Sequence, residues 1–210
     1  MSQGLLIGPL AATFLLTGCE QRHQPTPTAP GGSPAGIQTI VDVPIDISNV
    51  AGQTGTWNYA GQSFTVPPAT TLTHVRFNWY TRGQGSAAFG TLYLLDREYL
   101  GLPGDLSTST PGFLARSERI QDGAYLFAAD VTLTGGPSGT RYWVYTDTQG
   151  SFATSFDADV YSGGELYVTG YHAQPFRKSQ ASGRMVNGVF VPGPPNVSTD
   201  GNFRVQGTLQ

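Results

Sequence analysis

Thiols, charged side chains and long apolar runs are all scarce in this chain of 210 residues. The single cysteine, Cys19, excludes an internal disulfide. Only 12% of the residues are charged, about half of the usual share of roughly 25%, so Ser, Thr, Gly, Gln, Asn and Tyr must cover the surface. The net charge is −3 and no basic patch or stripe occurs, so nothing predicts nucleic-acid binding.

The apolar run near the start, residues 5–16, is too short to span a membrane, which takes about 20 apolar residues. It fits the apolar region of a secretory signal, which is about 7–15 residues long and is followed by small residues at the cleavage site. The first residues carry no Lys or Arg, although such signals usually begin with positive charge. The run predicts a signal peptide over residues 1–18.

The quartet Leu16-Thr17-Gly18-Cys19 resembles the lipobox of bacterial lipoproteins. The resemblance implies that the Cys19 thiol is alkylated with diacylglycerol, that the signal is cut just before it, and that the new amino terminus is acylated, as with palmitate. Several acyl chains on one residue give stable anchoring to a membrane, whereas a single chain is marginal. A lipidated Cys19 leaves no thiol for metal binding or catalysis. By the sorting rule of the same family, Glu20 in place of Asp implies the outer membrane of the cell envelope.

The segment after the signal, residues 19–36, is rich in Pro, Gly, Ser and Thr. It has too few apolar groups to offset the entropy of ordering. We expect a lipid-anchored, semi-extended linker that leads to one domain over residues 37–210.

Short runs rich in β-branched and aromatic residues recur through this domain, separated by Gly, Pro, Asn or Asp. No window keeps a helical period. The pattern predicts an all-β fold, a sandwich or a barrel. Two runs, residues 88–96 and 141–148, are apolar or aromatic on both faces, which favours a single antiparallel sandwich. The runs cover residues 39–47, 56–66, 71–81, 88–96, 113–120, 124–133, 141–148, 151–161, 165–170, 187–191 and 202–209.

Alternation along two of these runs assigns side chains to opposite faces of their strands. Val75, Phe77 and Trp79 face the core in one run, and Ala60, Phe64 and Val66 do so in the other. Trp79 and Trp143 are both predicted to lie in the core. The opposite faces carry candidate ligand-binding side chains, which would form one patch if the two strands pair: Trp57, Tyr59, His74, Arg76, Asn78 and Tyr80.

The order of several phrases resembles the choice-of-anchor type of bacterial surface domain. These phrases are AGQSFTV, LTHVRFNWY, GTLYLLD, GLPGDLSTS, AADVTLTGG, GTRYWVYTDT, YSGGELYV and DGNFRVQG. The resemblance covers most of residues 37–210 and implies an extracytoplasmic, jelly-roll-like β-sandwich. It implies little about activity, because a fold does not settle function.

Catalytic patterns are hard to find in this sequence. No G-x-S-x-G occurs, and no convincing acid/base pair of carboxylates stands out. A structural calcium site is the better prediction for the acidic residues, because Ca²⁺ takes clustered oxygen ligands. Its candidate ligands are Asp157, Asp159 and Glu165, and the alternative is a solvated strand end.

Aromatic rings beside polar side chains are typical of sugar-binding surfaces, because the C–H faces of sugars stack on Trp or Tyr. The first hypothesis is therefore a non-catalytic envelope module that binds a ligand such as a glycan. The second is a structural or adhesion lipoprotein that contacts a protein or cell-wall partner. A hydrolase is the least favoured, because it needs a carboxylate pair or a triad.

Overall fold

The prediction of an all-β fold is confirmed by the computed structural model of the chain. The structure describes residues 36–45, 50–53, 58–81, 86, 89–155, 159–169, 174–180, 184–186, 189–192 and 197–210. These residues lie within one compact unit, Pro34–Gln210. They form strands and, as their one helical element, the short 3-10 turn η1 (Pro103–Asp105).

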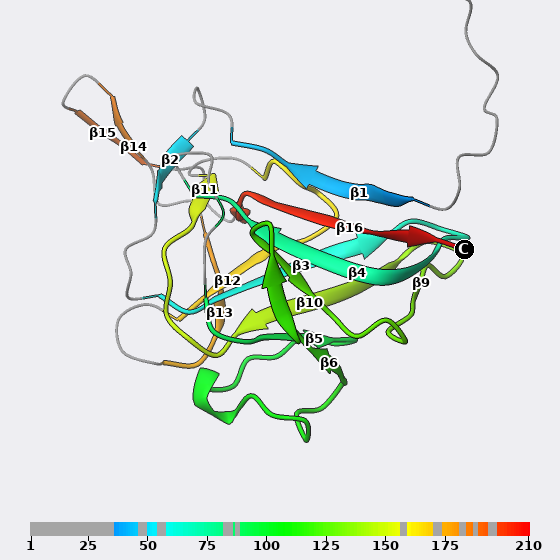
Figure 1. Ribbon diagram of the computed structural model, residues 1–210. Coiled ribbons are helices and arrows are strands. Elements are labelled where there is room, and N and C mark those ends of the chain that lie inside the picture. The colour runs from blue at the N-terminus through cyan, green and yellow to red at the C-terminus, as the bar shows by residue number, and fades with distance from the viewer. Residues whose placement is uncertain are drawn as a thin grey trace, which may run out of the picture. The chain divides into compact units, whose positions relative to one another are not determined.

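Six strands form a first antiparallel sheet, which we call the β4 sheet (Figure 1). Its order is β1-β16-β4-β8-β7, with β9 also paired to β4. The strands are β1 (Ile37–Val43), β16 (Phe203–Leu209), β4 (Thr71–Trp79), β8 (Ala124–Leu126), β7 (Arg119–Gln121) and β9 (Leu133–Thr134).

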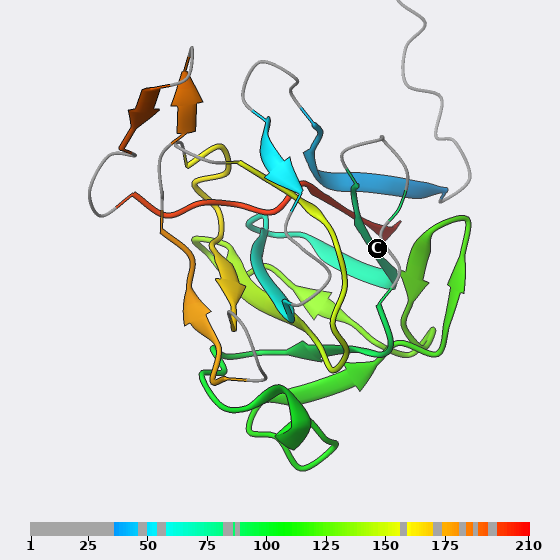
Figure 2. The ribbon, with the colours of Figure 1, turned by 90° about the vertical axis from the view of Figure 1, so that its left-hand side faces the viewer.

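Six further strands form a second antiparallel sheet, the β10 sheet, in the order β13-β12-β3-β10-β5-β6. The strands are β13 (Arg177–Lys178), β12 (Leu166–Val168), β3 (Ala60–Val66), β10 (Thr140–Thr146), β5 (Leu92–Leu95) and β6 (Phe113–Arg116). Figures 1 and 2 show the two sheets as two layers. Because β3, β4 and β5 alternate between the sheets, the chain crosses repeatedly from one layer to the other.

Two small ribbons complete the described strands. One pairs β2 (Val50–Gln53) with β11 (Ala153–Ser155), and the other pairs β14 (Arg184–Val186) with β15 (Val189–Val191). Asp122 and Gly123 turn the chain between β7 and β8 with φ values of 51° and 76°. Asp-Gly suits such a tight hairpin, because both central residues of a type I′ turn need a positive φ.

The apolar core lies between the two sheets and confirms the predicted faces. Val75, Phe77 and Trp79 of β4 are buried there, as are Ala60, Phe64 and Val66 of β3. Aromatic rings fill much of this core: Phe77 stacks on Phe203 with ring centroids 5.4 Å apart. Such pairs add specific geometry to the burial of apolar area.

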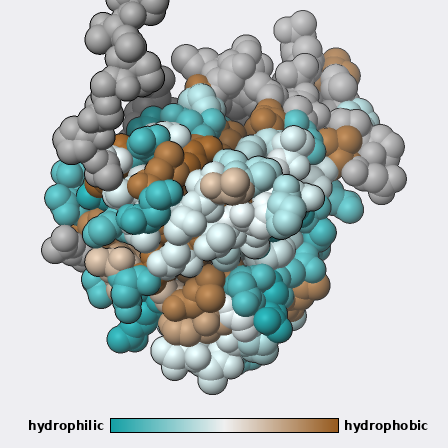
Figure 3. All heavy atoms as spheres, turned by 90° about the vertical axis from the view of Figure 1, so that its right-hand side faces the viewer, coloured by the Kyte–Doolittle hydropathy of each residue, from teal (hydrophilic) through white to brown (hydrophobic). Residues whose placement is uncertain are grey.

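Apolar side chains on the surface are scattered along the described part of the chain. Figure 3 shows separate hydrophobic patches among hydrophilic residues on one side of the molecule. Single exposed apolar residues of this kind are ordinary on a folded protein. Among the described residues no helix is long and apolar enough to cross a membrane. The exposed large apolar side chains are Ile37, Leu100, Leu102, Leu114, Ile120, Val160 and Val189.

Candidate functional site

The predicted stripe of polar side chains lies on the outer face of the β4 sheet. Alternation along β4 turns His74, Arg76 and Asn78 away from the core, and Tyr80 follows directly after the strand. His74 is exposed and has a positive φ of 51°, close to a register shift between β16 and β4. Arg76, Asn78 and Tyr80 are half-buried, so the stripe is only partly open to solvent.

Strands β16 and β1 extend this surface with charged side chains. Arg204 lies opposite Asn78 and donates from Nε and Nη2 to Asp42 Oδ2, at 3.1 and 2.8 Å. The Tyr80 hydroxyl donates to Asp42 Oδ1 at 3.0 Å, and the Arg204 guanidinium lies 5.5 Å from the centre of the Tyr80 ring. We call this surface the polar face; it comprises Asp42, His74, Arg76, Asn78, Tyr80, Arg204 and Gln206.

The polar face also holds two buried atoms without a hydrogen-bond partner, Arg76 Nε and Asn78 Oδ1. Burial raises the pKa of Tyr80 to about 12; the hydrogen bond and charge of Asp42 add to the rise, and Arg204 opposes it. Beside Tyr80 and Arg204 lies a hollow of about 390 Å³. Both partnerless atoms are shielded from solvent, so this face can offer them to a ligand or a partner only when the Arg76 and Asn78 side chains turn outward.

The two predicted strands do not pair, so the condition for a single ligand-binding patch is not met. β3 lies between β12 and β10, whereas β4 belongs to the other sheet. Tyr59, which precedes β3, is therefore separated from the stripe, and the single patch does not form. Tyr59 packs instead against a hydrophobic cluster of the β10 sheet. Trp57 lies outside the described residues.

This second cluster covers the outer face of the β10 sheet, which we call the aromatic face. Tyr145 lies at its centre, and its ring passes so close to Gly61 that any side chain at position 61 would overlap it. The Tyr99 N–H donates to the Tyr145 hydroxyl at 3.0 Å, which fastens the loop between β5 and β6 over the cluster. The buried members are Leu95, Leu106, Tyr145, Tyr167 and Phe176, and the half-buried ones are Tyr59, Tyr93, Tyr99, Phe113 and Trp143.

Trp143 corrects one prediction about the core. Trp79 is buried between the sheets as predicted, but Trp143 points outward from β10, opposite Ser63. Its indole lies half-buried on the aromatic face, and Nε1 donates to the Tyr167 hydroxyl at 3.2 Å. β10 is apolar on both faces because each face packs against its own cluster, so hydrophobicity alone did not identify the side of Trp143.

Two carboxylates meet beside Trp143. The Tyr167 hydroxyl lies 2.8 Å from Glu98 Oε1 and 3.2 Å from Glu165 Oε2. Lys178 Nζ lies 2.6 Å from Glu165 Oε2 and 3.6 Å from Glu98 Oε1. We call these four side chains the carboxylate network. Burial raises the pKa of Tyr167, and its hydrogen bond with Glu98 adds to the rise, so the phenol stays protonated and available as a donor.

Sequence reasoning missed the carboxylate network, although part of its signal is visible. Glu165 and Tyr167 alternate along one strand, and Arg141, Trp143 and Tyr145 alternate along another. Glu98, however, reaches the site from a loop. It is far from Tyr167 in the sequence, so no local pattern predicts that the two side chains are in contact. Half-buried rings beside charged hydrogen-bonding groups form the arrangement that commonly fixes a polar ligand in a specific orientation.

The residues of the predicted calcium site have different surroundings. Glu165 belongs to the carboxylate network, whereas Asp159 is exposed beside the buried Asp200. Asp157 lies outside the described residues, and among those described no group of three or more His, Cys, Asp or Glu side chains could hold a metal ion. Calcium binding stays a prediction.

Asp200 is a buried carboxyl group that the sequence did not single out. It accepts hydrogen bonds from the Tyr161 N–H at 3.0 Å and from Gln62 Nε2 at 3.2 Å. Burial raises the pKa of Asp200 to about 7; the Tyr161 and Gln62 donors lower it, and Asp159 raises it. Gln62 points into the core from β3, so this polar pair ties β3 to the segment that leads into β16.

Comparisons with protein families, with curated proteins and with solved structures find no match for this chain. Cys19 and the rest of residues 1–35 lie outside the described residues.

Proposed function

We propose that this chain is a non-catalytic module of the bacterial cell envelope, anchored by lipid at Cys19, that binds a glycan through its aromatic face. In this proposal residues 1–18 are a signal peptide and residues 19–36 are the linker. Several acyl chains attached to Cys19 hold the protein on the outer membrane, outside the cytoplasm. The β-sandwich then meets soluble or surface-bound polysaccharide.

The observation that carries the proposal is the half-buried Trp143 beside the carboxylate network. The Nε1–Tyr167 hydrogen bond fixes the edge of the indole, so little side-chain entropy remains to be lost when a ligand stacks on the ring. Glu98, Glu165 and Lys178 stand next to it and offer acceptors and donors to sugar hydroxyls. Charge-assisted hydrogen bonds of this kind are stronger than neutral ones.

The same network favours binding over hydrolysis. A glycosidase uses one protonated and one ionised carboxyl group on either side of the scissile bond. Here Lys178 contacts both carboxylates, and one phenol bridges them. The two groups therefore share one ammonium and one phenol hydroxyl, which hold both carboxylates in a hydrogen-bonded pair.

The test is a titration of the full-length protein in detergent against a panel of soluble polysaccharides, with and without calcium. We expect saturable binding that Trp143→Ala weakens about tenfold or more while the melting temperature changes little. Arg76→Ala on the polar face is the matched control and should leave the affinity unchanged. An unchanged affinity in Trp143→Ala would move the site away from the aromatic face.

The lipid anchor is tested separately by intact mass and membrane fractionation. Cys19→Ser should abolish the added lipid mass and release the protein from the membrane fraction. A Cys19→Ser protein that stays membrane-bound and is processed as before would contradict the anchor.

A second candidate function is a structural or adhesion role towards an envelope protein or a cell-wall component. The partnerless Arg76 Nε and Asn78 Oδ1 on the polar face favour it, since both side chains could turn outward and bond an incoming partner. Complex formation that Arg76→Ala weakens, without affinity for any polysaccharide, would support this role. Release of new reducing ends from a polysaccharide, lost in Glu165→Gln, would instead support a hydrolase.

A further inference from the structure

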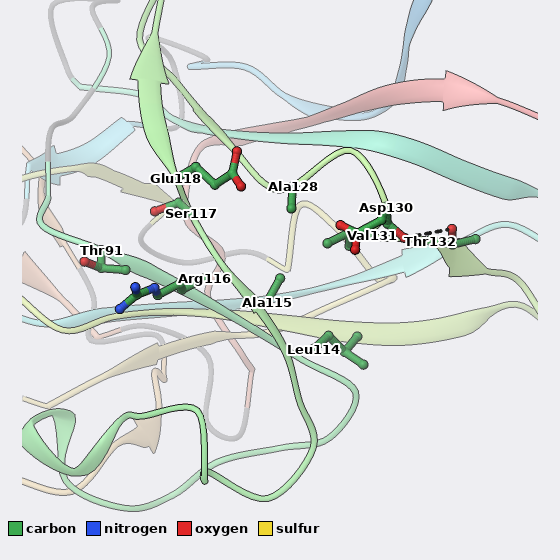
Figure 4. Close-up of a pocket in the computed structure, with 10 residues that line it drawn as sticks. All are labelled: Thr91, Leu114, Ala115, Arg116, Ser117, Glu118, Ala128, Asp130, Val131 and Thr132. Atoms are coloured by element: carbon green, nitrogen blue, oxygen red, sulfur yellow. Dashed lines mark hydrogen bonds between the residues drawn. The ribbon is translucent and has the colours of Figure 1, made fainter.

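A cavity of about 790 Å³ opens at the side of the sandwich where the chain crosses from one sheet to the other (Figure 4). One wall is β6 and the crossover residues Ser117 and Glu118; the other is the segment between β8 and β9. The volume falls within the roughly 300–1,000 Å³ of ligand pockets. The described lining residues are Thr91, Leu114, Ala115, Arg116, Ser117, Glu118, Ala128, Asp130, Val131 and Thr132.

The β6 wall is a free sheet edge. β6 ends the strand order of the β10 sheet, and within the described part of the chain it pairs only with β5. The Ser117 N–H donates to the Leu92 carbonyl at 2.8 Å, and the Leu92 N–H donates to the Ser117 hydroxyl at 3.0 Å, so these two residues are bonded to each other one position beyond the Tyr93–Arg116 pair. Because bonded pairs alternate along an antiparallel ladder, Arg116 turns its own N–H and C=O away from β5. These groups are ready to bond another extended chain.

Two carboxylates reach into the cavity from opposite walls. Figure 4 shows Glu118 and Asp130 pointing toward the space between the walls, while Arg116 points toward Thr91. Within the described residues, neither carboxylate forms a hydrogen bond or an ion pair with a basic side chain. A cationic group between them would face two negative charges at close range.

We propose that this cavity docks an extended peptide segment that adds as a new strand to the free edge of β6 and places a Lys or Arg side chain between Glu118 and Asp130. Strand addition is a recurrent mode of peptide recognition, in which main-chain hydrogen bonds supply affinity and alternate side chains supply specificity. The exposed Leu114 and the half-buried Val131 give the segment apolar contact beside the charges. The occupant is a segment of another protein.

A peptide fits this cavity better than a sugar does. The described lining contains no aromatic ring on which a sugar could stack, and it runs along an open strand edge. The site is also distinct from the aromatic face, since none of its described lining residues belongs to the cluster of that face. The proposal is therefore independent of glycan binding, and either can fail without the other.

The test uses the full-length protein and a hexapeptide of alternating threonine and lysine, titrated by NMR or calorimetry. We expect saturable binding, and roughly tenfold weaker binding to the double variant Glu118→Gln, Asp130→Asn. The double variant Asp96→Asn, Asp105→Asn removes two carboxylates outside the cavity; it is the charge-matched control and should bind as the unchanged protein does. A threonine–glutamate hexapeptide should not bind.

Strand addition is tested by changing the peptide and leaving the protein unchanged, so that no folding defect of a protein variant affects the result. Two versions of the lysine hexapeptide are made, one methylated on the odd backbone nitrogens and one on the even. Only one of the two sets of N–H groups would pair with β6, so methylation should abolish binding in one version and spare it in the other. Equal binding of both methylated peptides, or of free lysine amide, would overturn strand addition. Equal binding of the lysine and glutamate peptides, or an unaffected double variant, would overturn the assignment of the cavity.

Discussion

The two outer faces of the sandwich begin from the same strand alternation and differ in how their polar atoms are satisfied. On the aromatic face, the Tyr167 hydroxyl is hydrogen-bonded to Trp143 and to two glutamates beside a hydrophobic cluster. On the polar face, Arg76 Nε and Asn78 Oδ1 are buried without a partner. On the aromatic face these polar groups are therefore held by partners within the molecule, whereas on the polar face two buried atoms have none.

The largest expected contrast is structural. Tyr145→Ala should cost about 3–5 kcal/mol of unfolding free energy, because Tyr145 is fully buried at the centre of the second cluster. Tyr80→Ala on the polar face should cost only about 1 kcal/mol. Urea unfolding of the two variants measures the difference. Similar losses at both positions would mean that the aromatic face contributes no more to stability than the polar one.

The next effect concerns Asp200, which belongs to neither face. Its folded-state pKa of about 7 lies above the ordinary value of 3.8, so between these values the folded state binds more protons than the unfolded state. Asp200 therefore stabilises the fold at low pH, and this contribution is lost as pH rises through about 7, by up to about 4 kcal/mol. Asp200→Asn should remove this dependence in unfolding measured at pH 5 and pH 8.

Asp96→Asn, an exposed carboxylate paired with Arg97, is the control for that titration and should leave the difference between the two pH values as it is. Binding at both faces should also survive Asp200→Asn. A variant whose stability falls with pH as steeply as that of the unchanged protein would assign the dependence to another group.

A smaller effect is expected at Tyr167. Tyr167→Phe leaves Trp143 Nε1 without its acceptor and two carboxylates without their shared donor, at a cost of about 1–2 kcal/mol. Tyr80→Phe removes one exposed hydrogen bond and should cost about half as much. Thermal unfolding of both variants measures the two losses of stability. A larger loss in Tyr80→Phe than in Tyr167→Phe would show that the carboxylate network adds little stability.

The smallest effect is expected to differ in sign between the faces. Asn78→Val removes a partnerless buried oxygen and adds a β-branched side chain, so it should be neutral or stabilise by about 0.5 kcal/mol. Ser63→Ala under the aromatic face should cost about 1 kcal/mol, because the Glu165 N–H donates to the Ser63 hydroxyl at 2.8 Å. Chemical denaturation measures the change in unfolding free energy of both variants. A destabilised Asn78→Val would indicate that Asn78 has a partner in solution.

Strand positions and core faces were predictable because they depend on local alternation. Val75, Phe77 and Trp79 are buried where the sequence placed them. Which strands become neighbours depends on topology, and local alternation carries no information about it. For that reason the sequence left open whether Tyr59 joins the stripe on β4, placed Trp143 in the core, and assigned Glu98 to no site.

Among the described strands, β1 pairs only with β16, so the first strand is held by the last. Thr39 and Gln206, 167 positions apart, meet across this ladder with a side-chain hydrogen bond of 3.0 Å. Closing so long a loop carries a large entropic cost, and contacts of this separation slow folding. The β4 sheet cannot accept β1 until β16 has been synthesised. Of the described strands, the one that is made first is therefore among the last to dock.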